Sequence, residues 1–265
     1  MKDHKIYPLK MDKDKLGEID MGGVLPDVPH FTILLGSVRA GKSCLATNLA
    51  LSKRFYGDIY NCKILISSTA QNDAVLQDAL EHFDFVFNDY SEHLLNELVE
   101  MIETDDDPDC KYLIVFDDAI EGLIQKKAGK PDAFSRLITR YRHVGNEESE
   151  GRLSIVLCLQ YFKFLTPIIR NNAGAICLCG SFSQREMNKI AEVYSFLTPD
   201  GEEKTFIQQY KATQKKPYDF AYLNIKHQSF YRNFDELIYK KEFNEEKKED
   251  TKIDEEMPKK NEDVE

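Results

Sequence analysis

The sequence predicts an α/β fold, with a mostly parallel central sheet and helices on both faces. Short apolar runs typical of buried strands alternate along the chain with segments whose apolar residues recur at helical spacing. A glycine-rich turn joins the first of these runs to the first helical segment, and polar side chains directly follow two later runs. Functional groups are expected at such strand ends, because the carboxyl edge of a parallel sheet is where ligands bind.

The glycine-rich turn is a complete G-x-x-x-x-G-K-S phosphate-binding sequence between a strand at 31–35 and a helix at 44–53. Its glycines let the backbone approach phosphate oxygens, while the loop amides and the helix N-terminus present donors to negative charge. The lysine is expected to reach the β- and γ-phosphates of ATP, and the last serine to bind Mg²⁺. The predicted loop consists of Gly36, Ser37, Val38, Arg39, Ala40, Gly41, Lys42 and Ser43.

The other expected elements follow from the same two periodicities. Strands are predicted at 63–67, 83–87, 112–119, 153–159, 175–179 and 220–225. Helices are predicted at 72–82, from an N-cap at Ser91 to about Glu103, at 133–143 and at 184–197. Residues 231–234 are expected to lead away from the last strand.

Two carboxylates and one amide end neighbouring apolar runs. The run that begins at Tyr112 ends in Asp117 and Asp118, a Walker B pattern in which the first acid holds Mg²⁺ and the second polarises the attacking water. The run 153–159 ends in Gln160, which is placed to touch both the γ-phosphate and that water. The alternative for Gln160 is a strand-end residue that hydrogen-bonds to a loop.

The charge of the chain is uneven. Of the formal charge of −11, residues 240–265 carry −4 and residues 100–109 carry −6. The remainder is nearly neutral, so the acidic total does not exclude a basic surface that faces DNA. The acidic stretch 104–109 is expected to be a solvated loop rather than a metal site.

Length and composition predict one domain with appendages. The 265 residues suffice for one α/β domain, expected at 28–239, after a polar lead-in at 1–27. Residues 240–265 have little to bury and are expected to be a disordered tail. No leader-like stretch or membrane-length apolar run occurs, which predicts a soluble cytosolic protein. The six cysteines are expected to be reduced thiols.

The position of the strand that ends in Gln160, after the acidic strand, fits additional-strand P-loop ATPases better than kinases or GTPases. The order of elements resembles the FtsK/HerA superfamily. It is most similar to the genome-packaging ATPases of poxviruses, other large cytoplasmic DNA viruses and their virophage relatives. The resemblance covers about residues 28–235 and is carried by Gly36–Ser43, Phe116–Asp118, Arg142 with His143, Gln160, the sequence P-x-x-R-x-N at 167–172, and Tyr218–Leu223.

This resemblance implies an ATP-driven motor that moves double-stranded DNA without sequence preference into a viral capsid. It implies a ring of identical subunits, a capsid protein partner, and a location in the host cytoplasm or virus factory with association with the virion. Arg142 and Arg170 are then candidates for an arginine finger supplied in trans or for a γ-phosphate sensor, and surface ion pairs are the alternative. Asp118 stands where such ATPases usually have Glu, so water activation is expected to be slower or shared with Gln160.

Three other functions remain open. A cellular or plasmid DNA pump would use the same motifs. A small-molecule kinase is disfavoured, because no arginine-rich lid is apparent. An ATP-binding scaffold without turnover is disfavoured by the intact Lys42, Ser43, Asp117, Asp118 and Gln160.

Overall fold

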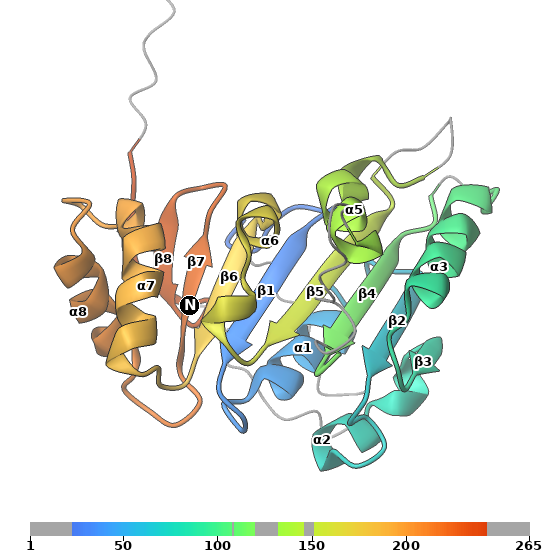
Figure 1. The fold of residues 1–265 in the computed structure, drawn as a ribbon, viewed down its shortest axis with the longest axis horizontal. Coiled ribbons are helices and arrows are strands. Elements are labelled where there is room, and N and C mark those ends of the chain that lie inside the picture. The colour runs from blue at the N-terminus through green and yellow to red at the C-terminus, as the bar shows by residue number, and fades with distance from the viewer. Residues whose placement is uncertain (1–22, 108, 120–131, 146–150, 243–265) are drawn as a thin grey trace, which may run out of the picture.

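A computed structural model describes residues 23–107, 109–119, 132–145 and 151–242 of the chain (Figure 1). The strands are β1 (Phe31–Gly36), β2 (Cys62–Ser67), β3 (Phe85–Phe87), β4 (Tyr112–Asp117), β5 (Leu153–Leu159), β6 (Ala175–Cys179), β7 (Phe220–Asn224), β8 (Ser229–Arg232) and β9 (Glu236–Lys240). The helices are α1 (Lys42–Leu51), α2 (Ala74–Gln77), α3 (Glu92–Thr104), α5 (Ala133–Arg140), α6 (Pro167–Asn172), α7 (Gln184–Tyr194) and α8 (Glu203–Thr213). Short 3₁₀ turns lie at Leu80–His82, Tyr141–His143, Phe162–Phe164 and Ser195–Leu197.

The nine strands of the described residues form one sheet in the order β3-β2-β4-β5-β1-β6-β7-β8-β9. The pairs from β3 to β6 are parallel, and the pairs from β6 to β9 are antiparallel. The expected α/β fold with a mostly parallel sheet is therefore confirmed. Strand β5 lies between β1 and β4, which is the arrangement that defines the additional-strand class.

Alternate residues of the central strands enter two separate cores. Phe31, Ile33 and Leu35 of β1 pack with buried side chains of α3, α5, α6, α7 and α8. Leu34 packs in the other core, with side chains of α1 and α2. Figure 1 shows α3, α5, α6 and α7 in front of the sheet and α1 behind it. Because both faces are covered, the central strands are apolar at nearly every position.

Several expected elements have different bounds. The helix predicted at 72–82 is a short helix followed by a 3₁₀ turn, and the one at 133–143 ends in a 3₁₀ turn after Arg140. The N-cap at Ser91 is as predicted, since its hydroxyl accepts from the amide of Leu94 at 3.0 Å.

The prediction that the strand at 220–225 is the last one and that residues 231–234 lead away from it is wrong. Tyr231 belongs to β8, which pairs with β7, and β9 follows as a further strand. Both strands carry charged residues and are only partly buried, so their apolar signal is weak. Helices α6 and α8 were likewise not predicted.

Only part of the two expected appendages lies within the described residues, because 1–22 and 243–265 lie outside them. The end of the lead-in packs on the antiparallel strands. The carbonyl of Val24 accepts hydrogen bonds from Tyr222 and Asn224, each at 2.9 Å, and Leu25 is buried. No helix in the described ranges is long and apolar enough to cross a membrane.

The acidic segment after α3 wraps around a buried arginine. The side chain of Arg152, just before β5, is 2% exposed and forms an ion pair with Asp105 at 3.1 Å. Its guanidinium also donates to four backbone carbonyl groups, those of Ile102, Asp105, Asp107 and Cys110. The described residues of 104–109 are mostly exposed, as expected of a solvated loop, and the backbone of this segment also satisfies a buried cation.

We expect Arg152→Met to lower the free energy of unfolding by about 3 kcal/mol, because it leaves partly buried carbonyl groups without a donor. Arg140→Met is the matched control. Arg140 pairs with Glu103 at the surface, where the two side chains are 54% and 36% exposed, so its loss is expected to cost under about 1 kcal/mol. Urea unfolding of both variants measures the difference, and equal losses would contradict a special role for Arg152.

Candidate functional site

The predicted phosphate loop turns tightly from β1 into α1 against the end of β6. Gly41, the last residue before α1, has φ +87°, a region that favours glycine. At Gly36 the constraint is space, because a Cβ there would lie 2.2 Å from the carbonyl oxygen of Cys179. The two glycines of the motif are thus required for different reasons, one by backbone conformation and one by close packing.

The phosphate loop brings together the ammonium group of Lys42 and the first backbone amides of α1. Lys42 is buried, and its ammonium group donates to the carbonyls of Gly36 at 2.8 Å and of Ser37 at 2.9 Å. An ammonium group has three donors, so one remains for a ligand. No side chain caps the N-terminus of α1. The first amides of this helix are therefore free of a side-chain cap and can bind an anion.

Ser43 and Asp117 meet across β5. The hydroxyl of Ser43 donates to Oδ2 of Asp117 at 2.9 Å, and the Asp117 side chain is buried. The other carboxylate oxygen, Oδ1, is buried and has no hydrogen-bond partner among the described residues. Burial raises the pKa of Asp117 above its usual range, and the charge of Asp118 raises it further, against the opposite effect of a hydrogen bond with the buried Cys158 thiol. A hydroxyl and a carboxylate with an unpaired buried oxygen fit Mg²⁺.

A second group of polar side chains lies next to this pair. The amide Nε2 of Gln160 donates to Oδ1 of Asp118 at 2.6 Å. Ser68, which follows β2, donates to the carbonyl of Asp118 at 2.9 Å. Asp118 has φ +48°, an uncommon conformation that turns the backbone away from the strand. The carboxyl ends of β2, β4 and β5 thus meet at one point of the sheet edge.

A pocket of about 610 Å³ opens beside Asp118 and Gln160. Its walls include Ser68, Tyr161 and Lys163, none of which was predicted as a site residue. The ammonium of Lys163 lies 5.1 Å from the ring centroid of Tyr161. Ser68 and Tyr161 each follow an apolar run, and this position was the signal in the sequence that could have identified them.

The two predicted arginines lie elsewhere. Arg142 is exposed in the 3₁₀ turn that precedes β5, so the seven residues of β5, about 20 Å of strand, separate it from Gln160. Arg170 lies in α6, which leads to the amino end of β6, where the amide of Gly174 bonds to the carbonyl of Phe31. Both therefore stand toward the sheet edge opposite the phosphate loop of their own chain.

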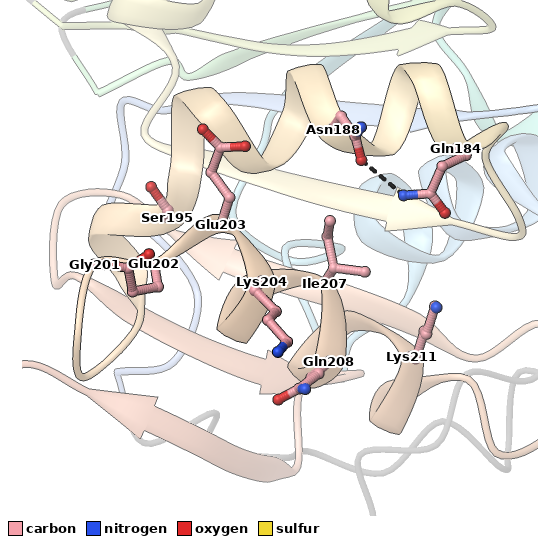
Figure 2. Close-up of a pocket in the computed structure, with 10 residues that line it drawn as sticks. All are labelled: Gln184, Asn188, Ser195, Gly201, Glu202, Glu203, Lys204, Ile207, Gln208 and Lys211. Atoms are coloured by element: carbon pink, nitrogen blue, oxygen red, sulfur yellow. Dashed lines mark hydrogen bonds between the residues drawn. The ribbon is translucent and has the colours of Figure 1, made fainter.

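A shallow polar groove of about 670 Å³ lies between α7 and α8 (Figure 2). Gln184 and Asn188 of α7 are joined by a hydrogen bond of 2.7 Å on one side, and Lys204 and Lys211 of α8 line the other. None of the phosphate-loop, carboxylate or amide residues above borders this groove. It is therefore separate from the candidate site.

No protein-family model and no curated protein matches this chain. Among solved structures, it is similar to the genome packaging NTPase B204 of Sulfolobus turreted icosahedral virus 2 in complex with AMP, at 15% identity and a TM-score of 0.56, covering 78% of this chain and 98% of B204. The same NTPase in complex with ATP-γS matches at 17% identity and a TM-score of 0.53, covering 78% and 97%.

A structure of B204 from Sulfolobus turreted icosahedral virus, where B204 is the DNA-packaging ATPase, is similar as well. It matches at 15% identity and a TM-score of 0.55, covering 78% of this chain and 98% of that one. At such identities the likeness concerns the fold. The chain therefore has the α/β P-loop fold of a viral genome-packaging NTPase, and the resemblance expected from its motifs is confirmed at the level of the fold.

Proposed function

We propose that this protein hydrolyses ATP to translocate double-stranded DNA and that it packages a viral genome into a capsid. One observation carries the proposal. Lys42, Ser43, Asp117, Asp118 and Gln160 come from separate segments and gather at one edge of the sheet, with hydrogen bonds from Ser43 to Asp117 and from Gln160 to Asp118. The similarity of the fold to that of B204, a genome-packaging NTPase, supports the choice of this activity over other ATP-driven ones.

The residues of the site divide the work of phosphoryl transfer. The loop amides and Lys42 hold the β- and γ-phosphates, which fixes the γ-phosphorus in place. Ser43 and Asp117 would hold Mg²⁺, which supplies charge neutralisation on the phosphate oxygens when it is bound. Asp118 accepts a hydrogen bond from the attacking water, and Gln160 orients both Asp118 and the water.

An arginine from a neighbouring subunit completes the proposed site. Arg142 lies too far from the phosphate loop of its own chain to act there, since β5 spans about 20 Å, and Arg170 lies in α6, which leads to the amino end of β6 on the opposite edge of the sheet from the loop. A closed ring would bring that edge of one subunit to the loop of the next. The charge on the transferring phosphoryl group would then be neutralised only when the neighbour is correctly placed.

DNA is proposed to bind through its phosphates. A motor that moves along the duplex cannot hold particular bases, because base-specific contacts would fix its position. Lysine and arginine contacts to the backbone give affinity without sequence preference and weaken with salt. An effect of DNA on ATP turnover separates a translocase from an ATP-binding scaffold, in which DNA would leave turnover unchanged.

Phosphate release, with and without double-stranded DNA of two unrelated sequences, tests the function directly. We expect hydrolysis that both DNAs stimulate equally, with stimulation lost at high salt. Lys42→Ala removes the cation that faces the β- and γ-phosphates and is expected to reduce turnover by about 100-fold or more. Lys63→Ala, a lysine outside the site, is the control. Hydrolysis that DNA does not affect at any salt concentration would contradict the translocase and favour the scaffold.

The carboxylates and the glutamine are expected to differ in effect. Asp118→Asn and Gln160→Ala should keep Mg·ATP binding but each lose about 100-fold in turnover. The loss of turnover in the double variant should be far smaller than the two single losses multiplied together, because the two side chains act as one hydrogen-bonded unit. Single-turnover kinetics and calorimetry measure these effects, and fully multiplicative losses would argue that the two residues act separately.

Asp117→Asn is expected to behave differently, by weakening Mg²⁺-dependent ATP binding itself. The variant should also be more stable than the unmodified protein in the absence of nucleotide, by about 1 kcal/mol or more, because it removes a buried negative charge that no cation neutralises. The raised pKa of Asp117 leads to the same expectation, because ionising this carboxyl group costs more free energy in the folded state than in the unfolded state. Equal stability at neutral pH would contradict this account.

The arginines are tested by mixing subunits. Arg142→Ala or Arg170→Ala should keep ATP binding in its own loop but deprive the neighbouring site. Mixing either variant with Lys42→Ala subunits should restore part of the activity, at interfaces that combine an intact loop with an intact arginine. Arg140→Ala, which removes a nearby exposed arginine, is the control and should be active alone. Lack of recovery in rings shown to exchange subunits would contradict a role in trans.

A further inference from the structure

An exposed tyrosine lies against the phosphate loop in a conformation that bulky residues rarely adopt. Tyr218, in the turn between α8 and β7, is 74% exposed and has φ +67°. A Cβ on Gly41 would lie 3.2 Å from Cδ1 of its ring, so the ring touches the backbone of the loop. No other aromatic ring in the described part of the chain packs against it. Such a residue indicates a functional constraint rather than a packing one.

The turn that carries Tyr218 is fixed by its neighbour. Oδ2 of Asp219 accepts from the amide of Lys216 at 2.8 Å and from Nε and Nη2 of Arg232 at 3.0 and 2.8 Å. Its other oxygen accepts from Asn233 at 3.2 Å. These bonds tie the turn to the β7–β8 hairpin. Tyr218 is therefore held in place by the protein itself, which lowers the cost of ordering it around a ligand.

The strand order sets the direction in which a nucleotide lies. The carboxylates and the amide proposed for the metal and the attacking water, Asp117, Asp118 and Gln160, lie at the ends of β4 and β5, on one side of β1. The γ-phosphate end must face that side, so the nucleoside end extends toward β6 and β7. There the loop meets the end of β6, since a Cβ on Gly180 would lie 2.9 Å from Ala40. Tyr218 stands just before β7, where the base would emerge.

We propose that the ring of Tyr218 stacks on the base of the nucleotide whose phosphates occupy the loop, an inference that rests on the proposed function. Stacking depends on the area of the rings rather than on their exocyclic groups. The site therefore accepts purine nucleotides in general, with ATP and GTP bound alike, and disfavours CTP and UTP.

Titration calorimetry of the 265-residue chain with Mg²⁺ complexes of ATP, GTP, CTP and tripolyphosphate tests the proposal. Tyr218→Ala should weaken ATP and GTP about five- to hundredfold and abolish their advantage over CTP. Tyr218→Phe keeps the ring and should stay within about twofold of the unmodified protein. Tripolyphosphate has no base, so its affinity should be the same in all three proteins, which shows that the loop is intact.

A fluorescence measurement gives an independent readout, because the chain contains no tryptophan. Tyr218→Trp introduces a single tryptophan at the proposed platform. ATP and ADP should quench its emission, and tripolyphosphate should not. Phe196→Trp is the matched control, since Phe196 is also exposed, at 42%, but lies in the turn after α7. Its emission should not respond to nucleotide.

The outcomes separate this inference from the function on which it rests. If the unmodified protein and Tyr218→Ala bind ATP equally well, the stacking role is overturned, but the proposed ATPase activity is not. Equal weakening of ATP and tripolyphosphate in Tyr218→Ala also overturns it, because the side chain would then support the loop. Unmodified protein that binds neither ATP nor tripolyphosphate overturns both.

Discussion

The site depends on the insertion of β5 between β1 and β4. Neighbouring strands lie about 4.8 Å apart, so this strand separates the phosphate loop from the carboxylates by about 10 Å. Ser43 and Asp117 still meet across the gap, because α1 brings the serine over the end of β5. The same strand adds Gln160 between the two groups. Without it, the loop and the acids would be adjacent, with no strand-end amide between them.

The interior of the site is organised for charge rather than for stability. Asp117 is buried with one oxygen unpaired among the described residues, and burial raises its pKa despite the lowering effect of the Cys158 thiol. Such a group costs free energy until a cation neutralises it. Asp118 is only partly buried and occupies an uncommon backbone region, where Ser68 and Gln160 hold it. Two successive acids thus have different surroundings and suit different roles.

The two edges of the sheet have different proposed tasks. The carboxyl edge gathers the loop, the carboxylates and Gln160, and the amino edge carries Arg142. A role for this arginine at a phosphate site therefore requires a second subunit. The antiparallel strands β7 to β9 extend the sheet beyond β6 and support the turn that holds Tyr218 against Gly41. A region with weak sequence signals thus contributes a side chain to the proposed nucleotide site.

The sequence by itself determined the fold class, the phosphate loop and the strands that end in Asp117 and Gln160, because apolar periodicity and a glycine-rich motif are local signals. It also indicated the order of β5 and β4 through the resemblance that these motifs carry. Only the tertiary structure decided that Ser68 contacts Asp118, that Arg152 is buried under the acidic segment, and that Tyr218 lies on Gly41. Each of these contacts joins residues at least 42 positions apart, and no local pattern records which distant segments a sheet brings together.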